Sequence, residues 1–150
     1  MMTRAALLAV VAAAFLLQPS QAPAQSGDDC QPFGRMPNYV PMHKGALPRN
    51  YDGIEVRVKK GDDYEVQFVA GRACRQVYTI RDGAREASDL EIQKNYLSQA
   101  AKIGGKQVYA DDRHLFVRGG APGKDTWLYL YSQENEIQVT VIEVQPFSRR

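Results

Sequence analysis

Three aromatic side chains alternate along the stretch "TWLYLYS": Trp127, Tyr129 and Tyr131. Alternate residues of an extended strand point to the same face of a sheet, so these rings would share one face, and Leu128 and Leu130 would point to the other. Tyr and Trp join a broad apolar face to a hydrogen-bonding tip, which suits a sugar ring or a protein surface. The spacing therefore predicts an aromatic binding surface, unless the N-terminal segment covers this face or Trp127 points into the core.

A second candidate binding site lies in the stretch richest in arginine, which contains Arg72, Arg75, Arg81 and Arg85. Arg75 and Arg81 are an even number of residues apart and would share a strand face. Guanidinium groups bind carboxylates and phosphates through planar pairs of hydrogen bonds. We therefore expect Arg75 and Arg81 to contribute to binding, and a small anion or an acidic glycan is one candidate ligand of the Arg72, Arg75 and Arg81 stretch. The alternative is a solvated sheet edge.

Residues that usually perform catalysis or bind metals are sparse. The two histidines, His43 and His114, lack the close spacing of zinc ligands. The aspartate pairs, such as Asp111-Asp112, fall mostly at expected turns, where aspartate caps local backbone N–H groups. We predict no catalytic residue, no metal site and no cofactor. One alternative stays open, an enzyme or enzyme inhibitor acting on glycan, in which His114 or the Asp111-Asp112 pair joins the aromatic strip.

The N-terminal segment has the pattern of a secretory signal peptide. Arg4 is followed by 13 apolar residues from Ala5 to Leu17, and small residues occupy positions 22 and 24. The apolar run is shorter than the ~20 residues that span a bilayer. We therefore expect cleavage after Ala24, a mature chain with no transmembrane segment, and a periplasmic or secreted location that includes association with the outer membrane.

The mature chain has the length of one domain, and its charge gives no strong attraction to nucleic acid. The whole chain holds 19 basic and 17 acidic residues, and loss of Arg4 brings these closer to balance. Its only two cysteines, Cys30 and Cys74, follow the expected signal segment. In an oxidising compartment such a pair forms a disulfide, so we expect one here and no nucleic-acid partner.

The strongest local signal is a helix between Ser88 and Ile103. Ser88 and Glu91 have the spacing of a capping box. Ile92, Tyr96 and Ala100 recur at helical spacing, so they form one apolar stripe, and Gly104 follows as a helix terminator. Such a helix should cover an apolar surface.

The rest of the mature chain alternates with the period of strands. Before the helix, residues 53–58, 64–70 and 71–80 are expected to be extended, and Gly71 marks a bend or bulge. After the helix come four runs at 106–111, 113–118, 125–132 and 136–144, joined by short turns that favour antiparallel hairpins. A single helix cannot supply repeated crossovers, so we predict an α+β fold: an antiparallel sheet with one amphipathic helix packed on one face. The expected organisation is a signal peptide at 1–24, an extended, proline-rich N-terminal arm at 25–50 and one domain at 51–150.

The stretches "AGRACRQVYTIRDGAREASDLEIQKNYLSQAAKIGGKQVYADD" and "GKDTWLYLYSQENEIQVTVIE" resemble the N-terminal domain of outer-membrane-protein-A (OmpA) family envelope proteins. The counterparts are Gly71-Arg72, Asn95-Tyr96, Gly104-Gly105, Lys124 with Trp127, and residues 140–143; Ala70 replaces the acidic residue of the strand motif. The arm stretch "RMPNYV" is similar to the family's entry segment.

The resemblance implies an envelope-associated accessory domain. Family members usually carry their wall-binding residues in a further C-terminal domain, so it does not imply peptidoglycan binding by this chain. The sequence ends directly after the last expected strand, and we therefore expect a stand-alone exported protein. The leading hypothesis is a non-catalytic interaction domain that docks on an envelope protein or glycan through its aromatic sheet face.

Overall fold

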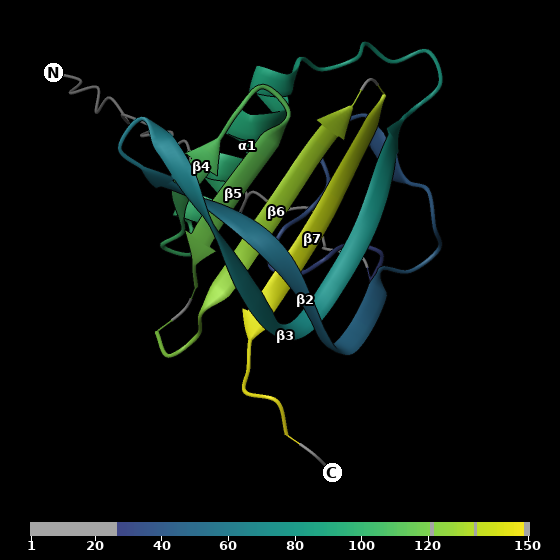
Figure 1. Cartoon of the computed structure of the whole chain (residues 1–150). Helices are drawn as coiled ribbons and strands as arrows, with labels where there is room; N and C mark the ends of the chain where they lie inside the picture. Colours follow the sequence, from purple (N-terminus) through teal and green to yellow (C-terminus); the bar gives the residue numbers. More distant parts are fainter. Residues whose placement is uncertain (1–26, 121, 134, 149–150) are drawn as a thin grey trace, which may run out of the picture.

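The computed structural model describes residues 27–120, 122–133 and 135–148. The expected signal peptide lies outside these described residues. Within them the chain forms an antiparallel, curled sheet and one helix (Figure 1), as predicted at this level. The elements run in the order β1 (Tyr39–Pro41), β2 (Leu47–Lys60), β3 (Asp63–Ile80), α1 (Asp89–Ala101), β4 (Lys106–Ala110), β5 (His114–Gly119), β6 (Thr126–Gln133) and β7 (Glu136–Val144).

The strands follow the order β1-β3-β7-β6-β5-β4, and β2 also pairs with β3. The four strands after α1 form consecutive hairpins, as their short turns predict. The last strand of the chain, β7, lies between β6 and β3 and therefore joins the two halves of the sheet.

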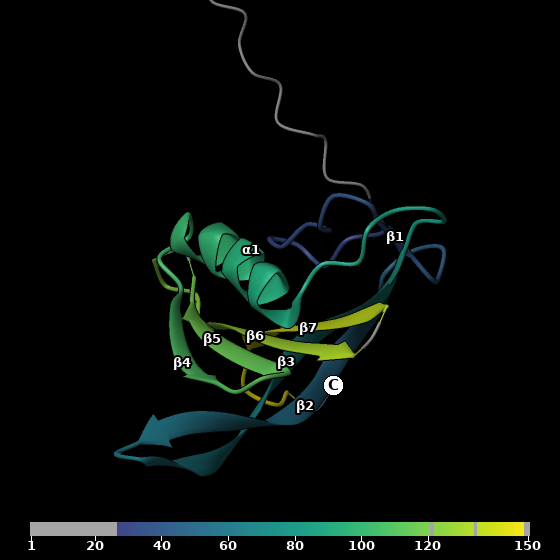
Figure 2. The ribbon, with the colours of Figure 1, turned by 90° about the horizontal axis from the view of Figure 1, so that it is seen from above.

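The sheet curls along β3, which is long enough to pair with three strands: β1 and β2 on one side and β7 on the other. Residues 71–79 of β3 pair with β7, whereas residues 63–75 pair with β2. Gly71 lies at the start of the β7 pairing, and a Cβ atom there would collide with the carbonyl oxygen of Glu143. From this point the β2–β3 hairpin extends away from β7 and turns across one side of the sheet toward β4 and β5 (Figures 1 and 2).

The helix begins where the sequence indicates and ends two residues earlier than predicted: α1 has Ser88 as its N-cap, and its last residue is Ala101 rather than Ile103. The Ser88 hydroxyl accepts a hydrogen bond from the backbone N–H of Glu91, and the Glu91 carboxylate accepts one from the N–H of Ser88. Gly104 follows with a φ of 75°, the left-handed conformation of a helix C-terminus. Ile92, Tyr96 and Ala100 are buried, and α1 contacts β4, β5 and β6 on the side away from the β2–β3 hairpin (Figure 2).

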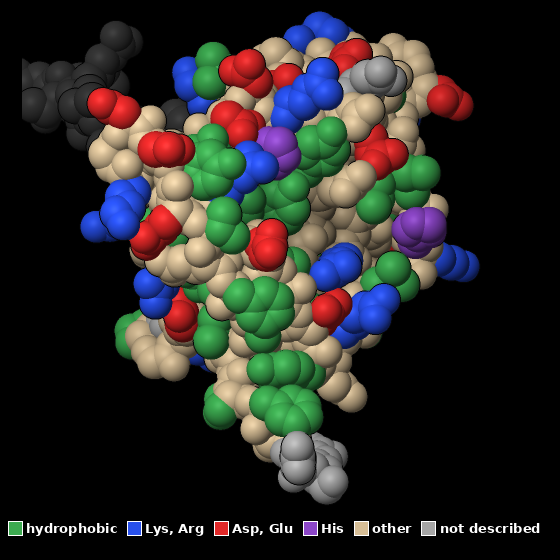
Figure 3. Space-filling view, in the orientation of Figure 1, with side chains coloured by type: hydrophobic (Ala, Val, Ile, Leu, Met, Phe, Trp, Pro, Cys, Tyr) green, Lys and Arg blue, Asp and Glu red, His purple; other side chains and the backbone are tan. Residues whose placement is uncertain are grey.

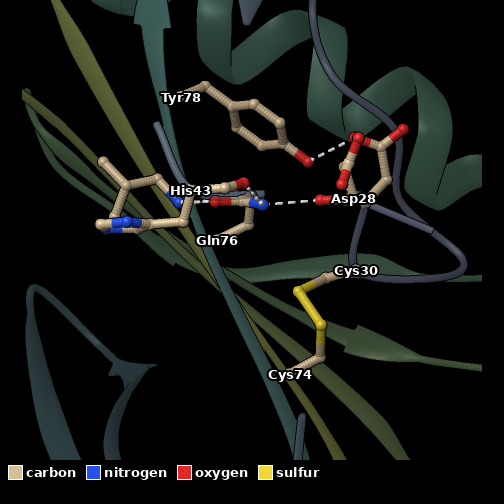
Figure 4. The surroundings of a disulfide bond; sticks show 8 residues. Asp28, Cys30, His43, Cys74, Gln76 and Tyr78 are labelled. Carbon is tan, nitrogen blue, oxygen red and sulfur yellow. Dashed lines mark hydrogen bonds between the residues drawn. A yellow bond between two sulfur atoms is a disulfide. The ribbon is translucent and has the colours of Figure 1, made fainter. Parts of the chain in front are cut away.

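The N-terminal arm is bound to the sheet by the predicted disulfide, which joins Cys30 to Cys74 on β3 (Figure 4). Phe33, Met36 and Tyr39 of the arm are buried in the same apolar cluster as the helix stripe. The arm is not strand-free: it contains β1 and the beginning of β2. Both are edge pairings with β3, which is where a proline-rich strand is tolerated.

A second, smaller apolar cluster occupies one end of the inside of the curl. Its buried members are Val56, Ala73, Phe116, Trp127 and Ile142. The β2–β3 hairpin thus packs on one end of the sheet face that α1 leaves uncovered. No helix in the described part of the chain is long and apolar enough to span a membrane.

Candidate functional site on the concave face

The inside of the curled sheet is only partly filled. We call the part of this face that the hairpin leaves open the concave face; it is viewed in Figure 3 from the side on which β2 crosses the sheet. Strand pairing sets its side chains in two rows, because residues paired across neighbouring strands point to the same side. The first row is Arg75, Thr140, Tyr129 and Phe116, and the second is Val77, Gln138, Tyr131 and His114.

Trp127 does not belong to the open part of this face. It shares the face with Tyr129 and Tyr131, as the alternation predicts, but it lies under the β2–β3 hairpin and is only 2% exposed. Arg118 lies over its ring, with the guanidinium carbon 5.2 Å from the ring centroid. The aromatic strip is therefore divided into a buried core residue and two half-buried tyrosines that remain accessible.

The accessible tyrosines extend into a row of stacked rings. Tyr129 and Phe116 are 4.6 Å apart with an interplanar angle of 4°, and His114 lies parallel to Tyr129 at 6.1 Å. Tyr131 packs against His114 at 5.1 Å, and its hydroxyl donates to Gln133. Burial raises the pKa of Tyr129 above its usual 10, so its hydroxyl stays protonated at physiological pH. The rows therefore present a rigid aromatic surface.

A pocket of about 410 Å³ lies beside this row, over β6, β7 and β3. Phe116, on β5, occupies one side of the Tyr129 ring, so the other face of the ring points toward β7 and the pocket. The remaining walls come from Arg75, Val77, Gln138 and Thr140 on the sheet and from Ile54 and Glu55 on β2. A volume of this size is in the range of small-ligand sites.

Arg75 has hydrogen-bonding capacity to spare in this pocket. Its Nη2 atom lies 3.2 Å from Oδ2 of Asp52, and its Nε atom is buried without a hydrogen-bond partner. A guanidinium carries five N–H donors, so one carboxylate leaves several of them unused. The side chain keeps 41% of its surface exposed, and a ligand in the pocket could therefore reach it.

The edge of the concave face is closed by a cluster that we call the seam, formed by Arg57, Tyr64, Tyr109, Asp111 and His114. Arg57 lies over the Tyr64 and Tyr109 rings, and its Nη1 atom is 3.0 Å from Oδ2 of Asp111. The other oxygen of Asp111 accepts hydrogen bonds from the backbone N–H groups of Arg113 and His114 and lies 2.8 Å from Nδ1 of His114.

These contacts set the charge state of Asp111. Partial burial favours the neutral acid, but the backbone and His114 hydrogen bonds outweigh it and hold the pKa of Asp111 below its usual 3.8. The carboxylate therefore stays ionised and tied to β2 through Arg57. Within the residues that the structure describes, no group of three or more His, Cys, Asp or Glu side chains is arranged to hold a metal ion.

The other predicted arginine does not join the pocket. Arg81 lies beyond the end of β3, exposed, with its backbone N–H bonded to the carbonyl of Asn38. Arg72 points to the opposite side of β3 from Arg75 and pairs with Glu143 at 3.0 Å. The arginine stretch therefore does not form one basic site, and Arg75 alone meets the aromatic row.

Several pocket residues were missed by reasoning from the sequence. Gln138 and Thr140 are polar positions within the otherwise apolar alternation of β7, which is the signal that could have singled them out. Ile54 and Glu55 reach the pocket only because the hairpin curls over the sheet, and nothing local in the sequence encodes that.

No protein-family model matches the chain, and no curated protein shows significant sequence similarity to it.

Proposed function

We propose that this protein is an exported, non-catalytic interaction domain of a Gram-negative cell envelope, which docks on an envelope polymer or protein through its concave face. We also propose that the domain is related to the N-terminal domain of OmpA-family proteins. Its proposed location is the periplasm or the outside of the cell, with association to the outer membrane. The Cys30–Cys74 disulfide supports export, because such bonds persist in oxidising compartments.

One observation carries this proposal: an open pocket in which Tyr129 and Arg75 converge on a sheet surface. Sites built on strands hold their side chains more firmly than sites on loops. The stacking of Tyr129 on Phe116 and the ion pair of Arg75 with Asp52 fix both side chains before a ligand arrives. A pre-organised site loses less entropy on binding.

In this proposal α1 is an architectural element that covers one face of the sheet. Its buried stripe shares an apolar cluster with Leu115, Val117 and Leu130, so the helix stabilises the sheet from the side opposite the pocket. The division leaves the concave face as the binding surface.

Co-sedimentation tests the proposal. The full chain is expressed in a Gram-negative host that exports it, purified, and mixed either with isolated peptidoglycan sacculi or with total cell envelopes. We expect it to pellet with at least one of them, and a Tyr131→Ala/Gln138→Ala variant to remain in the supernatant.

A matched control is Leu90→Ser, which changes an exposed apolar residue of α1 and should pellet like the native chain. Unchanged melting temperatures would show that both variants are folded. Pelleting of the concave-face variant to the native extent, or no pelleting of the native chain with either fraction, would contradict the proposal.

A glycan-acting enzyme is the second candidate, favoured by the contact of Asp111 and His114 with the aromatic row. A carboxylate at 2.8 Å from a histidine ring can orient it for proton transfer. However, Arg57 and backbone N–H groups already bind the Asp111 carboxylate. These bonds are what a structural contact between β2 and the sheet needs, and they serve no purpose in catalysis. Release of reducing ends from sacculi by the native chain, lost in His114→Ala, would favour the enzyme over the binding domain.

A further inference from the structure

We infer that the pocket on the concave face binds a neutral sugar ring, which lies against Tyr129 and bonds through its hydroxyl groups to Arg75, Gln138 and Thr140. This inference rests on the proposed binding function of the concave face and names its ligand class.

The aromatic wall has the geometry that a sugar ring requires. One face of a pyranose carries C–H groups, which pack on the flat, electron-rich face of an aromatic ring. The Tyr129 ring stands on the sheet with one face covered by Phe116 and the other facing the pocket. The covered face holds the ring in place, so its free face is a fixed platform.

The polar groups around this platform are mostly planar and carry pairs of donors or acceptors. Arg75 offers parallel N–H donors, and Gln138 offers an amide whose NH₂ already donates to Glu136 while its oxygen is open. Neighbouring hydroxyls of a sugar are spaced to bond two atoms of one such group. The Thr140 hydroxyl lies between Arg75 and Tyr129 in the strand pairing and adds a single donor and acceptor.

The charge of the pocket favours a neutral ring over an acidic one. Asp52 neutralises Arg75 at 3.2 Å, and Arg49 lies 3.6 Å from the same carboxylate. A carboxylate or phosphate bound beside Arg75 would also lie near Asp52, which would repel it. Glu55 borders the pocket from β2 with its side chain on the exposed side of the hairpin, and the remaining wall residues are uncharged.

The pocket is open on one side, and its volume of about 410 Å³ leaves room for one ring with its substituents. An open site of this kind binds a residue within a chain as well as a terminal one. The expected ligand is therefore a neutral sugar unit of a polysaccharide. Each pocket would bind one unit weakly, and several protein molecules on one polysaccharide would give a higher overall avidity.

The test uses two neutral trisaccharides, cellotriose and triacetylchitotriose, titrated into the full-length, ¹⁵N-labelled, exported chain and followed by NMR. Backbone amides of Arg75, Tyr129, Gln138 and Thr140 should shift and saturate with at least one of them, and trigalacturonate should bind at least tenfold more weakly.

Matched variants make the result specific. Arg75→Lys keeps the charge but loses the planar donors, and should weaken binding about tenfold. Arg72→Lys makes the same change on the same strand but on the opposite side, and should bind normally. Tyr129→Leu keeps an apolar side chain without the flat face and should abolish saturation, with the melting temperature checking that the variant is folded.

The outcomes separate this inference from the proposed function. If sedimentation depends on the concave face but neither neutral trisaccharide gives saturable shifts, the sugar inference is wrong and the interaction domain stands. If shifts saturate around Arg72 and Lys124 instead, or trigalacturonate binds more tightly, the inference is also wrong. If a neutral trisaccharide binds at Tyr129 while the chain pellets with no envelope fraction, the sugar pocket stands and the envelope-docking function falls.

Discussion

Arg57 on β2 and Asp111 in the β4–β5 turn form an ion pair of 3.0 Å between two parts of the sheet that share no strand pairing. This contact holds the β2–β3 hairpin against the sheet beside the concave face, and β2 contributes Ile54 and Glu55 to the border of the pocket. The seam therefore couples the stability of the hairpin to the shape of the proposed binding site.

Removal of the Asp111 charge should loosen the seam. Asp111→Asn keeps the size of the side chain but weakens its bonds to Arg57 and His114, and should lower the free energy of unfolding by about 1 kcal/mol at pH 7. Chemical denaturation measures this change. The control is Asp112→Asn, at the exposed neighbouring aspartate, which should leave the free energy of unfolding nearly unchanged.

The effect of Asp111→Asn should depend on pH in a defined direction. Folding lowers the pKa of Asp111 below 3.8, so its contribution is complete well above pH 3.8 and is lost as the pH falls through the folded pKa. The difference between native and variant should therefore shrink between pH 5 and pH 3. A difference that is constant over this range would show that the Asp111 charge does not stabilise the seam.

Two buried tyrosines should respond in opposite ways to loss of the hydroxyl. The Tyr78 hydroxyl donates to Oδ1 of the buried Asp29 at 2.8 Å, whereas the Tyr96 hydroxyl is buried with no hydrogen-bond partner (Figure 4 shows the Tyr78 site). Tyr78→Phe should lower the free energy of unfolding by about 1–3 kcal/mol, because Asp29 stays buried but loses a hydrogen-bond donor. Tyr96→Phe should leave stability unchanged or raise it by up to about 1 kcal/mol.

Urea denaturation of the two variants side by side decides this prediction. Both rings lie in the same apolar cluster, so loss of packing affects them alike. Equal losses for Tyr78→Phe and Tyr96→Phe would contradict the assignment of the two hydroxyl environments. Burial raises the pKa of both tyrosines above its usual value, and the comparison therefore holds across neutral pH.

The disulfide should contribute a large share of the total stability. It joins residues that are 44 positions apart in the sequence. The Cys30→Ala/Cys74→Ala variant should therefore have a free energy of unfolding lower by about 3–4 kcal/mol. Reductant should lower the unfolding midpoint of the native chain toward that of the double variant and leave the variant unchanged. A native midpoint that resists full reduction would show that the arm stays bound without the bond.

Export should remove the N-terminal segment at one position. The small residues at positions 22 and 24 are those that a signal peptidase recognises, so intact-mass measurement of protein from the periplasm should give a chain that begins at Gln25. Ala24→Arg should block this cleavage and leave a longer chain. Recovery of the native chain from the cytoplasm, with Cys30 and Cys74 reduced, would refute the export proposal.

The helix and most strands were predictable because their signals are local. Ser88, Glu91 and Gly104 define the ends of the helix by themselves, and alternation marks the strands on either side. The disulfide was predictable because only two cysteines are present. These features need no knowledge of which distant segments meet.

The concave site was not predictable in the same way, and Trp127 and Tyr129 show why. Both belong to one alternation pattern and point to the same face, yet Trp127 is buried and Tyr129 borders a pocket. The difference arises because the hairpin covers only one end of that face. This covering depends on the pairing of β3 with β7, which are far apart in sequence, and on the close approach at Gly71.

The central place of β7 also bears on how an exported chain would assemble. A protein threaded across a membrane emerges with its N-terminal end first, so the β2–β3 hairpin and the segment of α1 would arrive before the strand that unites the sheet. Pairings between distant segments also form slowly, because a long loop must close first. In an exported chain the two halves of the sheet could not join until β7 had crossed, because β7 is the strand that pairs with both.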